Sequence, residues 1–366
     1  MSASEPAVPT VAIIGPTGFI GSFITPAFVK AANANEITLR LLTRDVRKPT
    51  ISSYLADGGE GVKACGIDYD QPSTLEGALR GVHVLVNVMG AEGDFEARKA
   101  LILDAACKAR VKVYFPSEWG TNHNRTKRHH PIFESKARHH HEAERRGLKV
   151  VAVYTGLIIE FCFCKWFGKL TNAPLTSSHT LLILSSHRGI DSAANTWLIP
   201  GTGDEPNAMT SQADLGNYAL RAVLMSFHEP EKVPAHLEIY SDKGYDSLMT
   251  FHRAAKCLRY SFTIQLFSTW NSYADSMARA AGKPVQRKYV SLEEAVREYD
   301  AVKDGIPPHM LGPFLPVLCA ENVFDHSEAG VELLNPSHEI FRPKTVDDYA
   351  QEVEGKPWFN STPWGS

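Results

Sequence analysis

Three glycines near the start of the chain have the spacing of a phosphate-binding loop: Gly15, Gly18 and Gly21 follow one another at three-residue intervals. Gly15 would permit a sharp turn, Gly18 would let the backbone approach a pyrophosphate, and Gly21 would let a helix pack closely on its strand. A helix beginning here would also direct free N–H groups and its positive end at the phosphates. The pattern therefore indicates dinucleotide binding.

The flanking residues decide whether this pattern is significant, because glycines at this spacing also occur in ordinary strand-to-helix turns. Residues 11–14 are apolar and mostly β-branched, which predicts a buried strand before the loop. Apolar residues return at Phe19, Ile20 and Phe23 and predict a helix over 21–34. This context favours nucleotide binding over a plain turn.

A basic turn follows the second expected strand, 37–42. It contains Arg44, Arg47 and Lys48. In a dinucleotide fold this strand end meets the adenosine ribose, where an acidic residue selects NAD and cations accept a 2′-phosphate. The turn therefore favours NADP(H), although Asp45 argues mildly against it, and a merely solvated basic turn is the alternative.

Strands and helices alternate over the first half of the chain. Further strands are expected at 62–67, 82–88, 112–115 and 148–154, with helices at 72–79 and 96–109. This alternation predicts an α/β fold of the Rossmann type, with a doubly wound parallel sheet. Residues that follow 88 would then lie on the nicotinamide side of the cofactor.

The second half is less regular. We expect helices at 213–225, 247–258, 292–302 and 346–354, and strands at 194–199, 236–241 and 288–291. We therefore predict three parts, a disordered N-terminus, a nucleotide-binding domain and a smaller α+β substrate lobe at the C-terminal side that partly returns to the sheet. Their expected bounds are 1–10, 11–160 and 161–366.

Composition excludes several classes of protein. The 366 residues are 43% hydrophobic and 22% charged, with a net charge of −3, so nothing draws the whole chain to nucleic acid or to anionic membranes. Residues 1–10 lack the features of a secretory signal, and no apolar run is long enough to span a bilayer. The six cysteines lack metal or disulfide spacing, which favours reduced thiols in the cytoplasm.

The segment 121–149 is basic and contains six histidines. A metal site is not expected, because the consecutive residues 139–141 would point about 100° apart around a helix. Nucleic-acid binding is not expected either, because the segment is short and lacks interleaved aromatic residues.

Several motifs together resemble the NmrA-like branch of the atypical short-chain dehydrogenases, which includes isoflavone, phenylcoumaran benzylic ether and pinoresinol-lariciresinol reductases. They are GPTGFIG, LLTR, FPSEWG, ESKARHHHEAERRG and LKVVAVYTG. The ending KTVDDYAQEVEGKPW resembles that of fungal NmrA-like oxidoreductases. The resemblance implies an NADPH-dependent reductase, monomeric or homodimeric, acting on a small aromatic or other specialised metabolite. A redox-sensing regulator that binds NAD(P) and a protein partner without catalysis is the alternative.

The resemblance also implies a lysine as the acid–base group. The matching residue is Lys136, between Ser135 and Ala137, whereas its position in a basic helix would by itself indicate a solvated lysine. A lysine can act in this way where a dry pocket or neighbouring cations lower its pKa. His140 lies one turn further on the same face, where the relatives carry arginine. A literal Tyr-x-x-x-Lys pattern at Tyr299 and Lys303 is discounted, because it is expected far from the sixth strand.

The same resemblance implies the cofactor-binding residues. The pyrophosphate is assigned to Gly15, Thr17, Gly18, Phe19, Ile20 and Gly21, and the 2′-phosphate to Arg44 and Lys48. The nicotinamide and its ribose are assigned to Gly90, Pro116, Ser117 and Lys136. The junction between cofactor and substrate is assigned to Tyr154, Thr155, Gly156 and Leu157. Phe161, Phe163 and Trp166 are candidates for an apolar substrate wall, with core packing as the alternative.

The segment 169–188 has no counterpart in the resembling proteins. It is rich in Leu, Ser, Thr, Pro and His, and its ends can be encoded by the donor and acceptor sequences of an intron. Two interpretations stay open, a retained intron and a surface loop. A transcript that lacks these codons would decide for the first.

Overall fold

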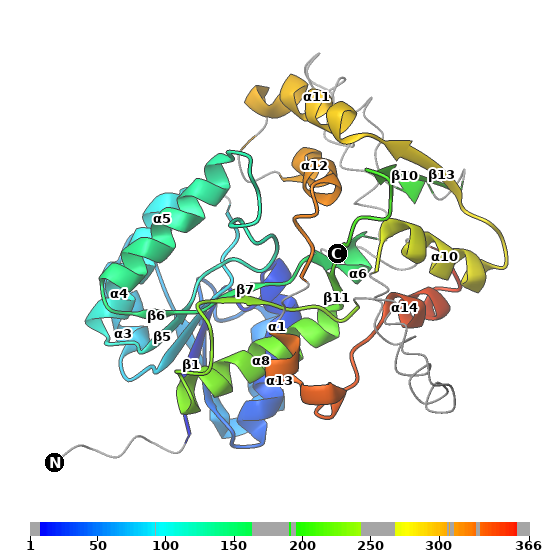
Figure 1. The fold of residues 1–366 in the computed structure, drawn as a ribbon. Helices are drawn as coiled ribbons and strands as arrows, with labels where there is room; N and C mark the ends of the chain where they lie inside the picture. Colours follow the sequence, from blue (N-terminus) through cyan, green and yellow to red (C-terminus); the bar gives the residue numbers. More distant parts are fainter. Residues whose placement is uncertain are drawn as a thin grey trace.

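The computed structural model describes residues 8–91, 93–162, 190–191, 195–242, 268–305, 307, 311–326 and 330–356. Its centre is a six-stranded parallel sheet in the order β3-β2-β1-β4-β5-β6 (Figure 1). The strands are β1 (Thr10–Ile14), β2 (Thr38–Thr43), β3 (Val62–Gly66), β4 (Val84–Asn87), β5 (Val113–Phe115) and β6 (Lys149–Val150). This order confirms the predicted Rossmann-type fold and places the topological switch point between β1 and β4.

Helices cover both faces of this sheet because its strands are apolar on both sides. Along β1, Val11 and Ile13 pack into one core cluster, and Ala12 and Ile14 pack into the other. The first face is covered by α1 (Phe19–Asn33), α2 (Pro49–Gly58) and α8 (Gln212–His228). The second face is covered by α3 (Pro72–Leu79), α4 (Phe95–Lys108) and α5 (Pro131–Arg145).

The second half of the chain returns to the first half through α8. This helix lies beside α1 (Figure 1), and Leu215 and Tyr218 of α8 share a core with Ile24 and Phe28 of α1. Gly216 makes the close approach possible, since a Cβ there would lie 2.9 Å from the carbonyl oxygen of Phe23.

The strand expected at 148–154 is divided in two, β6 and β7 (Ala152–Tyr154). The Val151 N–H donates to the Tyr114 carbonyl on β5, whereas the Ala152 N–H donates to the Ala235 carbonyl. The chain thus changes partner, and β7 pairs in parallel with β12 (His236–Glu238). A second parallel pair lies next along the chain, between β8 (Leu157–Ile158) and β11 (Met209–Thr210).

A separate small sheet lies in the second half of the chain, in the order β13-β10-β9. Its strands are β9 (Ile190–Asp191), β10 (Thr196–Pro200) and β13 (Gln286–Val290), and the further helices are α6 (Ile159–Cys162), α10 (Trp270–Ala281), α11 (Leu292–Val302), α12 (Leu315–Ala320), α13 (Val331–Leu334) and α14 (Val346–Glu352). In the described part of the chain, no helix combines the length and apolarity needed to cross a membrane. The segment 169–188, the helix expected at 247–258, Phe163 and Trp166 lie outside the described residues.

Candidate active site

The loop between β1 and α1 has the geometry that its glycines predict. Gly15 has φ +82° and packs against the end of β4, where a Cβ would lie 3.2 Å from the carbonyl oxygen of Val88. A Cβ on Gly21 would overlap the carbonyl oxygen of Gly15, so α1 rests directly on the loop rather than on the strand. Gly18, the N-cap of α1, is exposed, and no side chain caps the helix. The loop can therefore accept an anionic group at its backbone N–H groups.

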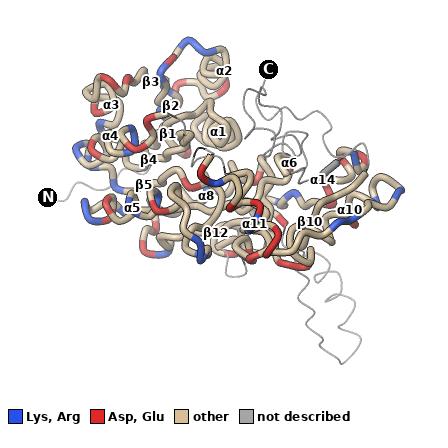
Figure 2. Tube along the Cα trace, turned by 90° about the horizontal axis from the view of Figure 1, so that it is seen from above, with Lys and Arg blue, Asp and Glu red and all other residues tan. Residues whose placement is uncertain are grey.

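The basic turn lies next to this loop. Lys48 Nζ donates to Thr17 Oγ1 at 3.3 Å, and Arg44 is exposed. Figure 2 shows a basic stretch of the tube, in blue, next to α2. Asp45 is engaged within its own turn, because its Oδ1 accepts the Arg47 N–H at 2.9 Å. This backbone hydrogen bond holds the pKa of Asp45 below its usual value. The acidic residue that argued against NADP(H) is thus paired with Arg47, while Lys48 lies beside the loop.

The ends of β4 and β5 are tied together. Ser117 Oγ donates to the Met89 carbonyl at 2.8 Å, and Trp119 Nε1 donates to the Asn87 carbonyl at 2.9 Å. The structure thereby brings together Ser117 and the chain leading to Gly90, as the sequence predicts.

Lys136 reaches the same edge from α5. Its Nζ donates to the Glu118 carbonyl at 3.2 Å and lies 3.4 Å from Glu118 Oε2. The side chain is 15% exposed, so the interpretation of a solvated surface lysine is wrong for this helix face. The helix carries Lys136 inward because Ile132, Ser135, His139 and His140 on the neighbouring positions are buried.

Glu118 is the centre of a buried ionic group that we call the Glu118 cluster, comprising Glu118, His123, Lys136 and His140. His140 Nε2 lies 2.8 Å from Glu118 Oε1, and His123 Nδ1 lies 3.4 Å from Oε2. Burial alone would raise the pKa of Glu118, but the Lys136 charge and the two imidazoles hold it well below its usual range. Glu118 is therefore an anion beside the Lys136 ammonium.

Tyr154 and His236 continue the cluster toward the surface. The Tyr154 hydroxyl lies 3.0 Å from His236 Nδ1, and burial raises the pKa of Tyr154. Tyr154, Thr155, Gly156 and Leu157 are all buried, and the N–H groups of Thr155 and Gly156 donate to the Gly120 carbonyl. Their assignment to the junction of cofactor and substrate stays a prediction.

The three consecutive histidines of α5 lie in different surroundings. His139 Nε2 lies 2.9 Å from the Tyr114 hydroxyl, and burial lowers the pKa of His139 to about 4. His140 contacts Glu118, whereas the His141 side chain is 83% exposed. Within the described residues, no group of His, Cys, Asp or Glu is arranged to hold a metal ion.

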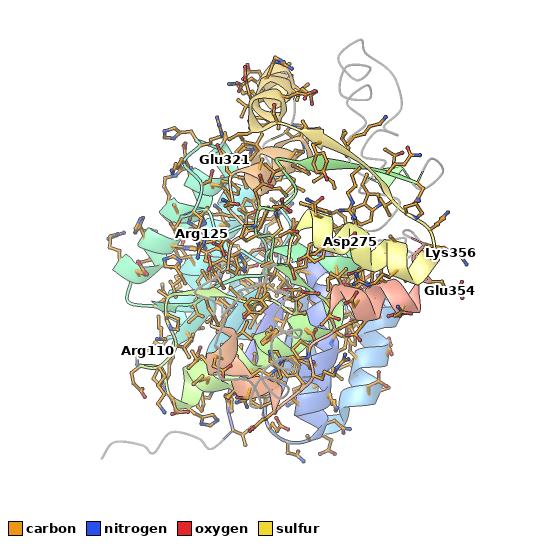
Figure 3. All side chains as sticks on the ribbon, turned by 45° about the vertical axis from the view of Figure 1, so that its right-hand side comes forward. Arg110, Arg125, Asp275, Glu321, Glu354 and Lys356 are labelled. Atoms are coloured by element: carbon orange, nitrogen blue, oxygen red, sulfur yellow. The ribbon has the colours of Figure 1, made fainter. Side chains whose placement is uncertain are left out.

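The loop after Gly120 is held by two ion pairs with the second half of the chain. The Arg125 guanidinium pairs with Glu238 on β12, and Arg128 Nε lies 2.7 Å from Glu321 Oε1 after α12. Figure 3 shows Arg125 and Glu321 on the same part of the molecule. These pairs hold the loop that carries His123 against the cluster.

Aromatic residues lie at two points around the candidate site, one beside the glycine loop and one at the start of α5. Phe161 packs on Phe19 with ring centroids 5.4 Å apart, beside the glycine loop. Tyr299 lies nearer to α5 than the sequence suggests. Its ring centroid is 6.3 Å from that of His130, the N-cap residue of α5. Lys303 is exposed and donates to Asp300, so the Tyr-x-x-x-Lys pattern has a local explanation.

Sequence reasoning gave no role to Glu118, His123 or His236. The one signal for Glu118 was its position between Ser117 and Trp119, directly after a buried strand. His236 comes from a distant strand, and no local pattern marks it.

Comparison with known proteins places this architecture in a family. The pattern of the NmrA-like family matches residues 8–241, more than half of the chain. A phenylcoumaran benzylic ether reductase of Pyrus communis is 27% identical over 222 residues, which are 58% of this chain and 64% of that protein, so the match spans less than two thirds of its length. An isoflavone reductase of Cicer arietinum is 22% identical over 308 residues, covering 79% of this chain and 80% of the relative.

Solved structures share the fold over almost their whole length. An isoflavone reductase structure matches with a TM-score of 0.66 at 20% identity, covering 94% of this chain and 99% of that one. A leucoanthocyanidin reductase of Vitis vinifera in complex with NADPH matches with a TM-score of 0.66 at 17% identity and the same coverage. With its glycine loop, its parallel sheet and the family match over residues 8–241, this chain belongs to the NmrA-like family.

Proposed function

We propose that this protein is an NADPH-dependent reductase with Lys136 as its acid group. It would transfer a hydride to an activated double bond, carbonyl, imine or benzylic ether of a small aromatic or other specialised metabolite. The observation that carries the proposal is the Lys136 ammonium, 15% exposed and held by Glu118 beside the joined ends of β4 and β5. Its relatives include reductases of isoflavones and phenylcoumarans, and one structural neighbour holds NADP+ and pinoresinol.

The residues present fit the cofactor. A pyrophosphate can approach the start of α1 because its N-cap residue Gly18 is exposed and has no side chain. Arg44 and Lys48 would hold the 2′-phosphate, and Gly90, Pro116 and Ser117 would face the nicotinamide and its ribose. When bound, NADPH supplies the hydride.

The chain's own contribution is a cation at the reacting end. The Lys136 ammonium lies 3.4 Å from Glu118 Oε2 in a buried setting, where opposite charges attract more strongly than in water. An ammonium so placed donates a proton to the substrate or stabilises the negative charge that develops on it.

The test is a fluorescence titration of the purified protein with NADPH and with NADH, followed by turnover assays. We expect much tighter binding of NADPH, and its oxidation with at least one aryl enone, imine or benzylic ether. Tight NADPH binding without oxidation for any of these classes would contradict the reductase and support the redox-sensing alternative. Failure to bind either dinucleotide would overturn the whole proposal.

A further inference from the structure

The inner side of Lys136 is connected to the protein surface by a series of ionisable groups. Lys136 Nζ lies 3.4 Å from Glu118 Oε2, and Glu118 Oε1 lies 2.8 Å from His140 Nε2. The imidazole rings of His140 and His236 have centroids 6.0 Å apart, and His236 is exposed. A proton could cross from one ring to the other through an intervening water molecule.

A lysine in this setting needs such a connection. Its side chain is 15% exposed, and a bound substrate would cover the face that remains open. After Lys136 has given a proton to the substrate, the groups left in contact with it belong to Glu118, on the inner side. Reprotonation from that side would therefore have to pass through the Glu118 cluster.

We propose that His236, His140 and Glu118 return to Lys136, from solvent, the proton that it gives up in each reduction. The inference rests on the proposed function, because it assumes that Lys136 acts as an acid. One proton enters at His236, passes to His140, moves to Oε1 of Glu118, and reaches Lys136 after the carboxyl group turns. No bond between heavier atoms changes, and the net result is one solvent proton delivered to the substrate.

The charge balance of the cluster favours this direction. The Lys136 charge is the main influence that keeps the pKa of Glu118 low, and burial acts in the opposite sense. Once Lys136 is neutral, burial dominates, so the carboxylate can accept a proton from His140 for a short time. The other ionisable groups near His236 are His123, Glu144 and Tyr154, and burial lowers the pKa of His236, which helps it release a proton inward.

His123 provides a second branch of the same route. Its ring lies 5.3 Å from that of His140 and 5.8 Å from that of Tyr154, whose hydroxyl contacts His236. Both branches begin at His236, so the sharpest test is made there.

The first experiment compares His236→Ala with His129→Ala, which removes an exposed histidine outside the cluster. In weak buffer, His236→Ala should turn over about tenfold more slowly than wild type. The reduction in rate should be larger in the steady state than in the first turnover, because Lys136 already carries its proton when the first turnover begins. Added imidazole should restore the rate of His236→Ala, while His129→Ala should match wild type throughout.

Equal steady-state rates for His236→Ala and His129→Ala would overturn the relay and leave the proposed function standing. A wild-type protein that binds NADPH but reduces nothing would overturn both. The two failures are therefore distinguishable.

A second experiment needs no substrate. In Lys136→Met the Glu118 carboxylate loses its cation, so the carboxyl 13C resonance of Glu118 in an NMR spectrum should titrate at a higher pH than in wild type. Lys136→Arg keeps the cation and should leave that titration near its wild-type position. An unchanged titration of Glu118 in Lys136→Met would show that the two groups are not coupled and would overturn the relay.

Discussion

The loop between β1 and α1 carries no ionisable side chain from Gly15 to Gly18, whereas the Glu118 cluster consists of ionisable side chains. The loop works through its backbone, because the N-cap residue Gly18 has no side chain that could occupy the start of α1. The cluster works through charge, with a buried carboxylate that contacts three basic groups. We expect the contribution of the loop to stability and NADPH binding to depend on added side-chain volume and not on pH. The contribution of the cluster to stability and turnover should depend on charge and on pH.

The largest effect is expected at Lys136. Lys136→Ala should lower turnover by about 10²- to 10⁴-fold, the usual contribution of a positioned acid. The dissociation constant for NADPH should stay close to that of wild type, because the loop is untouched. Steady-state kinetics and fluorescence titration measure the two quantities separately. Lys127→Ala, at an exposed lysine of the same basic segment, is the control, and equal turnover in both variants would remove Lys136 from the mechanism.

Removal of the buried anion should be next in size. Glu118→Gln takes one partner from a buried ion pair and should lower the free energy of unfolding by about 3 kcal/mol at neutral pH. The pKa of Glu118 is lowered in the folded protein, so its carboxylate contributes stability above the pKa of the unfolded chain. That stability is lost as the pH falls below about 5, toward the folded value.

Urea unfolding at several pH values checks this expectation. The free energy of unfolding of wild type should fall on acidification from pH 5 more steeply than that of Glu118→Gln. If the free energies of unfolding of the two proteins fell in parallel with decreasing pH, Glu118 would not be the titrating anion.

Added volume in the loop should have an intermediate effect. The methyl group of Gly21→Ala would overlap the Gly15 carbonyl oxygen and should cost about 1–3 kcal/mol, with weaker NADPH binding. The free energy of unfolding of Gly21→Ala should fall with decreasing pH as steeply as that of wild type. This distinguishes an effect on the loop from an effect on the cluster. Gly77→Ala is the matched control, because that helical glycine has space for a methyl group. If Gly21→Ala behaved like Gly77→Ala, the steric account of the loop would be wrong.

A smaller effect is expected for the cation beside the loop. Lys48→Ala should raise the dissociation constant for NADPH about tenfold through loss of one charge-assisted hydrogen bond. Binding of NADH should change little, because it lacks the 2′-phosphate. Arg47→Ala is the control. The Arg47 guanidinium lies beside Asp45, so its loss should leave the preference for NADPH over NADH intact. An equal loss for both dinucleotides in Lys48→Ala would contradict the assignment.

The smallest effect is a gain in stability far from both regions. Arg110 ends α4 with φ +56° and lies away from Arg125 and Glu321 (Figure 3). Arg110→Gly should raise the free energy of unfolding by about 0.5–1 kcal/mol, because glycine adopts this conformation without a steric cost. Arg110→Ala keeps the cost and should bring no gain in a thermal melt. A melting temperature of Arg110→Gly no higher than that of Arg110→Ala would disprove this account.

The contrast between loop and cluster also explains what the sequence could predict. The loop is continuous, and Gly15, Gly18 and Gly21 stand in it at fixed spacing, so its geometry was predictable. The cluster is assembled from β5, the following loop and α5, so neither the burial of Lys136 nor its contact with Glu118 followed from local patterns. The split of strand 148–154 at Val151 was hidden for the same reason, because it depends on the distant Ala235. Helices α2 and α10 were missed although each is amphipathic.

The contact between α1 and α8 has a consequence for synthesis on the ribosome. All six strands of the central sheet have been translated by Val150, yet α8 is complete only at His228. Until then Ile24 and Phe28 of α1 lack the residues that bury them in the finished protein. The nascent chain therefore carries an uncovered apolar helix face over a long stretch of translation, which is the kind of surface that chaperones hold.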